Sequence, residues 1–275
     1  MAVDTHKVYP NAPLAFVTVE VRFPGETGQG VPSVVQRAFR EVLGDDWVTE
    51  QLAKQEVTLG INPGRPPAQT TRAVNVPRFT VRDRTLAVVL TSNSVTVETT
   101  RYLGWPKFRL TLERALRASS QLVKPEGVTR VGIRFVDEVR VDQVGNQAVD
   151  WAEWLTPDVV APALAAMAAA GWPPVSWTGA AQYSIGDAKQ LVLRYGPQYG
   201  YVVNPVGPLR RADPPAPGPL FLLDFDSFWE PPTIPRFDVD ELLGTCDELR
   251  EPTRRLFDQV TTPRLVDDVF EKEQP

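Results

Sequence analysis

The sequence predicts an α+β protein made of two similar halves, each with the element order strand, helix, four strands, helix. Three observations support this fold class. Several segments alternate apolar and polar residues, two segments carry the apolar stripe of an amphipathic helix, and the same order of elements recurs after residue 127. With 275 residues, 43% of them hydrophobic, the chain can bury a substantial core.

The first half, residues 14–127, follows an N-terminal arm of residues 1–13. In residues 14–23 valines and phenylalanines alternate with polar side chains, which predicts a half-buried strand. In residues 31–43 the apolar positions form one stripe at helical spacing, and Gly44 is suited to end the helix. A strand followed by a helix therefore opens this half.

Four extended segments and a second helix complete the first half. The expected strands are 55–61, 76–82, 86–91 and 95–102. The sequence Thr-Ser-Asn-Ser at 91–94 predicts a tight turn, which makes the last two strands antiparallel neighbours. The second helix is expected to open at Trp105, with its apolar side reaching Val123.

The second half, residues 128–275, repeats this order and is expected to pack against the first. Its expected elements are a strand at 128–141, an alanine-rich helix at 157–170, strands at 175–185, 190–195, 199–204 and 220–229, and helical segments at 239–270. This is the layout of TATA-binding-protein-like and helix-grip folds, in which a curved, mostly antiparallel sheet wraps around a long helix. The alternative is one irregular α+β sandwich without internal symmetry.

Two residue counts weigh against the familiar catalytic sites. The chain has one histidine, His6 in the N-terminal arm, and one cysteine, Cys246. These counts disfavour a Ser-His-Asp triad, a Cys-His pair, a histidine metal site and a cysteine zinc site, and one cysteine cannot form an intrachain disulfide. We therefore expect no cofactor and favour a non-enzymatic protein.

The net charge and the hydropathy of the sequence limit which classes of partner and which cellular compartment we expect. A net charge of −5 and a pI near 5.1 disfavour nucleic acid as a partner. No run approaches the roughly 18 apolar residues of a membrane span, and the N-terminus lacks the apolar core of a signal peptide. The sequence thus predicts a cytoplasmic protein that does not bind membranes.

The segment LFLLDFDSFW contains the first candidate site. In an extended strand Asp224 and Asp226 point to the same face, with carboxylates roughly 7 Å apart. Two such carboxylates could bind a divalent cation or a cationic ligand. The competing interpretation is that they pair with arginines on a neighbouring strand, which would neutralise the metal site.

The strand TRVGIRFVDEVRV contains those arginines and an acidic residue, Asp137, that interrupts its apolar phase. Arg130 and Arg134 fall on the polar phase and could meet Asp224 or Asp226 across the sheet. Asp137 falls on the apolar phase unless a bulge near Val136 resets the alternation. Either Asp137 is buried with a partner, or the edge of the sheet bends at this point.

Tryptophans are concentrated in the second half. They are Trp151, Trp154, Trp172, Trp177 and Trp229. Trp177 and Trp229 are candidates for lining a pocket for a flat or cationic ligand. Packing of the same side chains in the core beneath the helix is the favoured alternative.

Several separated stretches resemble a sporadically distributed, uncharacterised prokaryotic protein family that is known only by a number. The resembling stretches are VYPNAPLAFVTVEVRF, GWPKFRLTLERAL, VGIRFVDEVRV, LLDFDSF and LFDQVTTPRLVDDVF. The resemblance brings no reaction or catalytic residue, but the patchy distribution of the family implies an accessory, defence or toxin-antitoxin-like role. One departure is Arg250, where the family often has a histidine.

The leading hypothesis is a non-enzymatic binding or regulatory protein that grips a protein, a peptide or a small ligand. Its expected binding residues are Asp224, Asp226, Arg134, Asp137, Trp177 and Trp229. The alternative is a metal-dependent hydrolase or nuclease using Asp224 and Asp226, with Asp137 or Glu138 as a further ligand. A third reading is a nucleic-acid-binding saddle. Homo-oligomer formation is compatible with all three.

Overall fold

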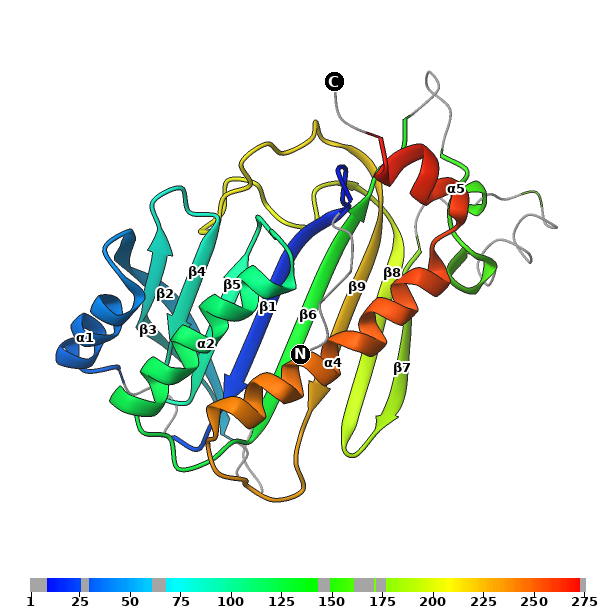
Figure 1. The fold of residues 1–275 in the computed structure, drawn as a ribbon. Coiled ribbons are helices and arrows are strands. Elements are labelled where there is room, and N and C mark those ends of the chain that lie inside the picture. Colours follow the sequence, from blue (N-terminus) through cyan, green and yellow to red (C-terminus); the bar gives the residue numbers. More distant parts are fainter. Residues whose placement is uncertain are drawn as a thin grey trace.

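The computed structural model describes residues 9–25, 30–60, 68–142, 149–160, 171 and 177–272, with the backbone alone at 54–60 and 68–74. Within them, nine strands form one sheet in the order β2-β3-β4-β5-β1-β6-β9-β8-β7 (Figure 1). The strands are β1 (Leu14–Arg22), β2 (Trp47–Gly60), β3 (Ala68–Val81), β4 (Leu86–Leu90), β5 (Ser94–Thr99), β6 (Arg130–Val139), β7 (Gly179–Gly186), β8 (Lys189–Gly200) and β9 (Gly218–Trp229). All neighbouring strands are antiparallel. The α+β class and the antiparallel sheet are thus confirmed.

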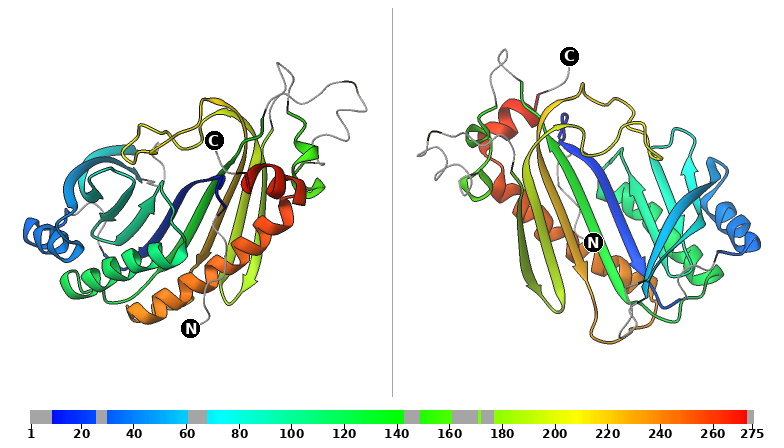
Figure 2. Two further views of the ribbon diagram at one scale, coloured as in Figure 1. Left: turned by 45° about the horizontal axis from the view of Figure 1, so that its top comes forward. Right: turned by 180° about the vertical axis from the view of Figure 1, so that it is seen from behind.

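Helices cover one face of this sheet, which we call the helix face (Figures 1 and 2). They are α1 (Ser33–Leu43), α2 (Trp105–Leu122), α4 (Val239–Val260) and the short α5 (Pro263–Leu265), which continues into a helical turn at Val266–Phe270. In β1, Val17, Val19 and Val21 point toward the helices and are fully buried. Their alternation in the sequence is therefore the pattern of one covered and one uncovered face.

The helices begin and end where the sequence provides stop signals. Helix α1 ends at Gly44, whose φ of 111° is one that residues with a Cβ rarely adopt. Helix α2 begins after Gly104, which has a φ of 95°, and carries a proline in its first turn. The expected positions of both helices are confirmed.

The opposite face of the sheet, which we call the loop face, is crossed by the connection between β8 and β9, residues 201–217 (yellow in Figure 2). Glu138 of β6 is buried beneath it and accepts hydrogen bonds from the backbone N–H of Val202 and Val203 at 2.9 and 3.0 Å. Arg211 of the loop forms an ion pair with Glu138 at 2.7 Å. Further along, the N–H of Arg210 donates to the carbonyl of Arg84 at 2.8 Å. The loop therefore contacts both β6 and the turn that follows β3, which lie in different halves of the sheet.

The second half differs from the prediction in its strands. The two strands expected at 190–195 and 199–204 are one strand, β8, so that three strands rather than four follow β6 in the described residues. The pair Gly196-Pro197 is typical of a break, but pairing with β7 stops at Tyr195 while pairing with β9 continues to Gly200. Pro197 lacks a backbone N–H, but β8 no longer pairs with β7 at this position, so the missing donor breaks no hydrogen bond between them. The strand therefore continues through Pro197.

Other boundaries differ or lie outside the described residues. Strands β2 and β3 begin earlier than expected, β2 at Trp47 instead of 55 and β3 at Ala68 instead of 76, because they pair with each other along their whole length. The alanine-rich helix expected at 157–170 is described only at 157–160, where it is helical, and residues 175–176 of the next expected strand lie outside the described residues. No helix in the described ranges has the length and hydropathy required to cross a membrane.

Candidate ligand-binding site

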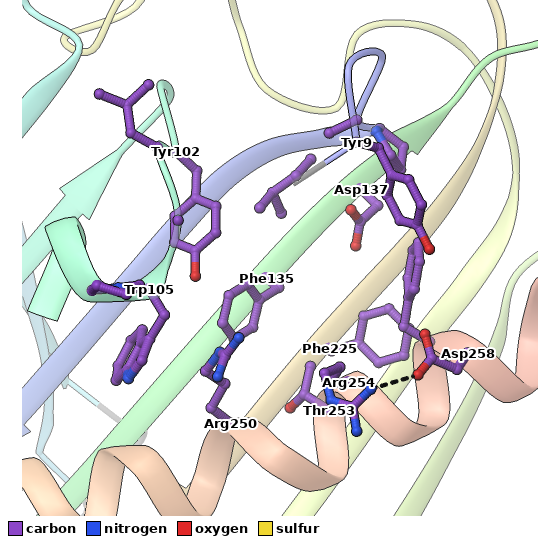
Figure 3. A pocket seen from close by; sticks show the side chains of 17 residues that line it. Tyr9, Tyr102, Trp105, Phe135, Asp137, Phe225, Arg250, Thr253, Arg254 and Asp258 are labelled. Atoms are coloured by element: carbon purple, nitrogen blue, oxygen red, sulfur yellow. Dashed lines mark hydrogen bonds and ion pairs between the residues drawn. The ribbon is translucent and has the colours of Figure 1, made fainter. Parts of the chain in front are cut away.

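A cavity of about 490 Å³ lies on the helix face between α2, α4 and the central strands (Figure 3). Phe135 and Asp137 of β6 and Phe225 of β9 contribute to its floor. Residues 9–14, residues 102–106 and one side of α4 form the walls. Cavities of roughly 300–1,000 Å³ are typical of small-molecule sites, so that this one can hold a ligand.

Two local structures position the walls. On α4, Arg250, Thr253 and Phe257 recur at helical spacing and therefore share the side that faces the sheet. The segment before β1 is fixed by Asn11, whose backbone N–H donates to the carbonyl of Phe270 at 3.0 Å and whose side chain donates to that of Val269 at 3.1 Å. The cavity is thus enclosed by chain segments that are distant in sequence.

Asp137 is the buried acid of this cavity. Its side chain is on the helix face, only 5% of the residue is exposed, and it lines the cavity floor. Among the described residues it has no hydrogen-bond or ion-pair partner. Burial raises the pKa of the carboxyl group to about 8, and the negative charge of Asp224 adds to the effect. Asp137 is therefore protonated at neutral pH when the cavity holds no cation.

The sequence predicted burial of Asp137 with a partner, or a bulge in its own strand. The strand itself is regular, because β6 pairs with β9 without a shift from Val131 to Val139. The irregularity lies on the neighbouring strand, where the register of β1 against β6 shifts between Leu14 and Phe16. The expectation of a bulge in β6 was therefore wrong, and Asp137 stays on the apolar phase, buried without a partner among the described residues.

Aromatic side chains form most of the remaining lining. Tyr102 contacts Phe135 edge-on with ring centroids 6.2 Å apart, and Phe225 contacts Phe257 in the same way at 6.2 Å. Trp105 lies at the start of α2 and carries the guanidinium of Arg250 over its ring at 5.6 Å. The cavity therefore combines flat apolar walls with one buried acid.

The basic residues of the cavity are on α4. Arg254 forms ion pairs with Glu251 at 3.0 Å and with Asp258 at 2.9 Å, the second of which is drawn in Figure 3. Both acids lie one turn away on the same helix, so that they offset the charge of Arg254 locally. Arg250 projects from α4 into the cavity lining.

Asp224 and Asp226 lie on the loop face and not in the cavity. Both oxygens of Asp224 accept from Arg134, at 2.6 and 2.8 Å, and Arg194 lies 3.5 Å away. Asp226 faces Arg130 at 3.6 Å. The cross-strand pairing expected from the sequence is therefore present. In the described part of the chain no three acidic, histidine or cysteine side chains are grouped as metal ligands.

The two candidate tryptophans are partly buried and pack against the hydrophobic core. Trp177 contacts Tyr195 and Phe221 edge-on, each with a centroid distance of 5.7 Å. Trp229 ends β9 and packs against the main core. Neither contributes to the cavity lining, whereas Trp172 lies outside the described residues.

The structure describes the cysteine of the chain but not its histidine. His6 lies outside the described residues. Cys246 is fully buried in α4, and burial raises the pKa of its thiol to about 12. A thiol with that pKa does not act as a nucleophile at neutral pH.

Comparison of the chain with protein-family models, with curated proteins and with solved structures gave no significant match. The site is therefore defined by its own geometry. Sequence reasoning identified Asp137, because a charged residue interrupts an apolar phase. It missed Tyr9, Tyr102, Trp105 and Arg250 as cavity residues, since they come from separate segments and share no spacing that would indicate a common site.

Proposed function

We propose that this protein is a non-enzymatic binding protein that holds a small ligand in the cavity above Asp137. The observation that carries the proposal is a buried carboxyl group, without a partner among the described residues, on the floor of a ligand-sized cavity. A buried polar group costs free energy unless it is paired, and such groups are retained where they serve a function. The accessory or defence role implied by the resemblance is part of this proposal.

The chemistry of the cavity supports binding rather than turnover. Asp137 provides a buried acid and the phenylalanines provide flat contact surfaces, whereas the second carboxyl group of the lining, Asp258, is held in an ion pair with Arg254. Acid and base catalysis would require a second titrating group within hydrogen-bond reach of the reacting atom. Binding of a ligand requires only the charged and aromatic groups that line the cavity.

We further propose that the fold is an internal duplication of the TATA-binding-protein-like type. The first strands of the two halves, β1 and β6, pair at the centre of the sheet. Outward from β1 follow β5, β4, β3 and β2, and outward from β6 follow β9, β8 and β7. This mirrored order supports a duplication in which the second half has one strand fewer among the described residues.

The alternative functions have weaker support. A hydrolase that uses Asp224 would have to release its carboxylate from Arg134 before a metal could bind. A nucleic-acid saddle would need a basic loop face, yet Arg130 and Arg134 are offset there by the acids of β9. Both alternatives therefore rank below ligand binding.

Recovery of a bound molecule tests the proposal. The purified full chain is incubated with a metabolite extract, separated by gel filtration and denatured, and the released small molecules are identified by mass spectrometry. Ala12 lines the cavity and is otherwise exposed, so that Ala12→Trp should block the cavity without disturbing the core. The matched control is Ala212→Trp in the exposed loop on the other face.

We expect one or a few compounds to be enriched on the wild type and on Ala212→Trp and to be lost on Ala12→Trp. Equal recovery from all three proteins, or from none, would refute ligand binding in the cavity. Turnover of a nucleotide or an ester with a divalent metal, abolished by Asp224→Ala, would refute the non-enzymatic assignment.

A further inference from the structure

We propose that the ligand of this cavity is an organic amine: a protonated nitrogen on a compact apolar body about the size of one or two rings. The inference rests on the proposed function and specifies the chemical class of ligand. In the complex the ammonium group of the ligand pairs with the carboxylate of Asp137, and the apolar body lies among the aromatic walls.

The first argument is that Asp137 forms no ion pair with any cation of the described residues. The residue is 5% exposed, lines the cavity and has no polar partner among the described residues. Arg254 is engaged by Glu251 and Asp258, and Arg250 lies over Trp105. Since no described side chain forms an ion pair with this carboxyl group, an occupant of the cavity that carries a positive charge would complement it.

The second argument is the composition of the walls. Phe135, Phe225 and Phe257 have no polar groups, and the rings of Tyr102 and Trp105 belong to the same lining. Such surfaces favour an apolar or aromatic body, and ring faces also attract an ammonium group. A metal ion that entered this cavity would shed its bound water, and these walls offer no ligands to replace it. An alkylammonium group is less strongly hydrated, so it loses far less hydration free energy on entering. The cavity therefore fits an organic cation better than an inorganic one.

The third argument concerns the other charged groups around Asp137. Facing it are Tyr9 from the N-terminal segment, Tyr102 from the start of α2, and Arg250, Arg254 and Asp258 from α4. Behind it on the loop face lies Asp224, which is itself paired with Arg134. The arginines are on the helix side of the cavity and the acid is on the strand side. An amine bound against β6 therefore places its charge at the acidic side.

The arrangement links binding to a proton. In the empty cavity the carboxyl group is neutral below about pH 8, because burial raises its pKa to about 8. An ammonium ligand pairs with the ionised form, so that each binding event releases one proton. The affinity should consequently rise by about tenfold per pH unit between about pH 6 and pH 8 and level off above.

A matched set of probes tests the ligand class. Phenethylamine, 2-phenylethanol and 3-phenylpropionate share a phenyl group on a short chain and differ in charge. Their binding to the full chain is measured by titration calorimetry at about pH 6, 7 and 8, in two buffers of different ionisation enthalpy that count the released protons. The variants are Asp137→Asn, Ala12→Trp and the control Asp267→Asn, which removes an exposed acid outside the cavity.

We expect phenethylamine to bind at least about tenfold more tightly than the alcohol or the acid, with release of one proton and with the pH dependence given above. Asp137→Asn should remove the preference for the amine, Ala12→Trp should remove binding altogether, and Asp267→Asn should change neither. Circular dichroism of each variant establishes that it is folded. Ala12→Trp keeps the test valid if Asp137→Asn does not fold.

The outcomes separate this inference from the proposed function. Equal or tighter binding of the alcohol or the acid, blocked by Ala12→Trp, would refute the amine class but support the cavity as the binding site. Amine binding that persists in Asp137→Asn would place the amine elsewhere and refute the inference. Absence of binding by all three probes would also refute it, whereas the recovery experiment would still decide whether the cavity holds another ligand.

Discussion

Replacing Asp137 with asparagine should make the protein more stable at neutral and alkaline pH. Asparagine has nearly the same size and shape as aspartate but does not ionise. In the wild type the carboxyl group is buried, with no partner in the part of the chain that the structure describes, and its pKa is raised from 3.8 to about 8. The folded state therefore holds a proton that the unfolded state releases at any pH between these two values.

The sign and the size of the stability change follow from this difference in bound protons between the folded and the unfolded state. Because the unfolded chain binds fewer protons than the folded one, the free energy of unfolding falls with rising pH by up to about 1.4 kcal/mol per unit. The loss begins near the unfolded pKa of 3.8 and ends near pH 8. Between about pH 5 and pH 8 the wild type should lose about 4 kcal/mol relative to Asp137→Asn. This is a large fraction of the total stability of a typical domain.

The assay is urea unfolding of both proteins at several values between about pH 5 and pH 9. The other titrating groups are shared, so that they cancel in the difference between the two curves. Asp267→Asn, with the same change at an exposed position, should follow the wild type. Parallel curves for wild type and Asp137→Asn would refute the burial of an unpaired carboxyl group and, with it, the basis of the proposed site.

Three further predictions concern the loop face and its loop. Arg134→Met should cost about 3 kcal/mol in urea unfolding, because it leaves the buried carboxylate of Asp224 with one distant arginine, whereas Arg255→Met at an exposed pair should change stability by less than about 0.5 kcal/mol. Glu138→Gln should speed tryptic cleavage within residues 201–217 several-fold, since it weakens the bonds that hold this loop; an unchanged rate would contradict that role. Millimolar Mg²⁺ or Mn²⁺ should leave the Tm unchanged, and a rise that Asp224→Asn abolishes would favour the metal-site alternative.

The elements that sequence predicts well are those with one buried face. Residues 14–23 and 31–43 alternate or repeat with clear periods, and the structure contains β1 and α1 at these places. Strand β2 extends well beyond its expected limits, because it is fixed by pairing with β3 and not by an apolar phase. The break expected at Gly196-Pro197 depended on composition, while pairing to β9 decides the outcome.

The candidate site was predictable only in part. Asp137 interrupts an apolar phase, and this local signal identifies it without knowledge of the fold. The walls depend on how α4, the N-terminal segment and the start of α2 meet, which no spacing in the sequence encodes. Composition also could not distinguish a pocket tryptophan from a core tryptophan, and Trp177 and Trp229 belong to the core.

The central position of β1 has a consequence for the order in which the protein is made. On the ribosome, β1 can pair with β5 as soon as the first 127 residues have emerged, but its other edge waits for β6. Until then a valine-rich strand presents unpaired N–H and C=O groups, which are a template for adding a strand from another copy. A fragment that ends at residue 127 is therefore expected to self-associate, and translation of β6 is the step that closes this edge.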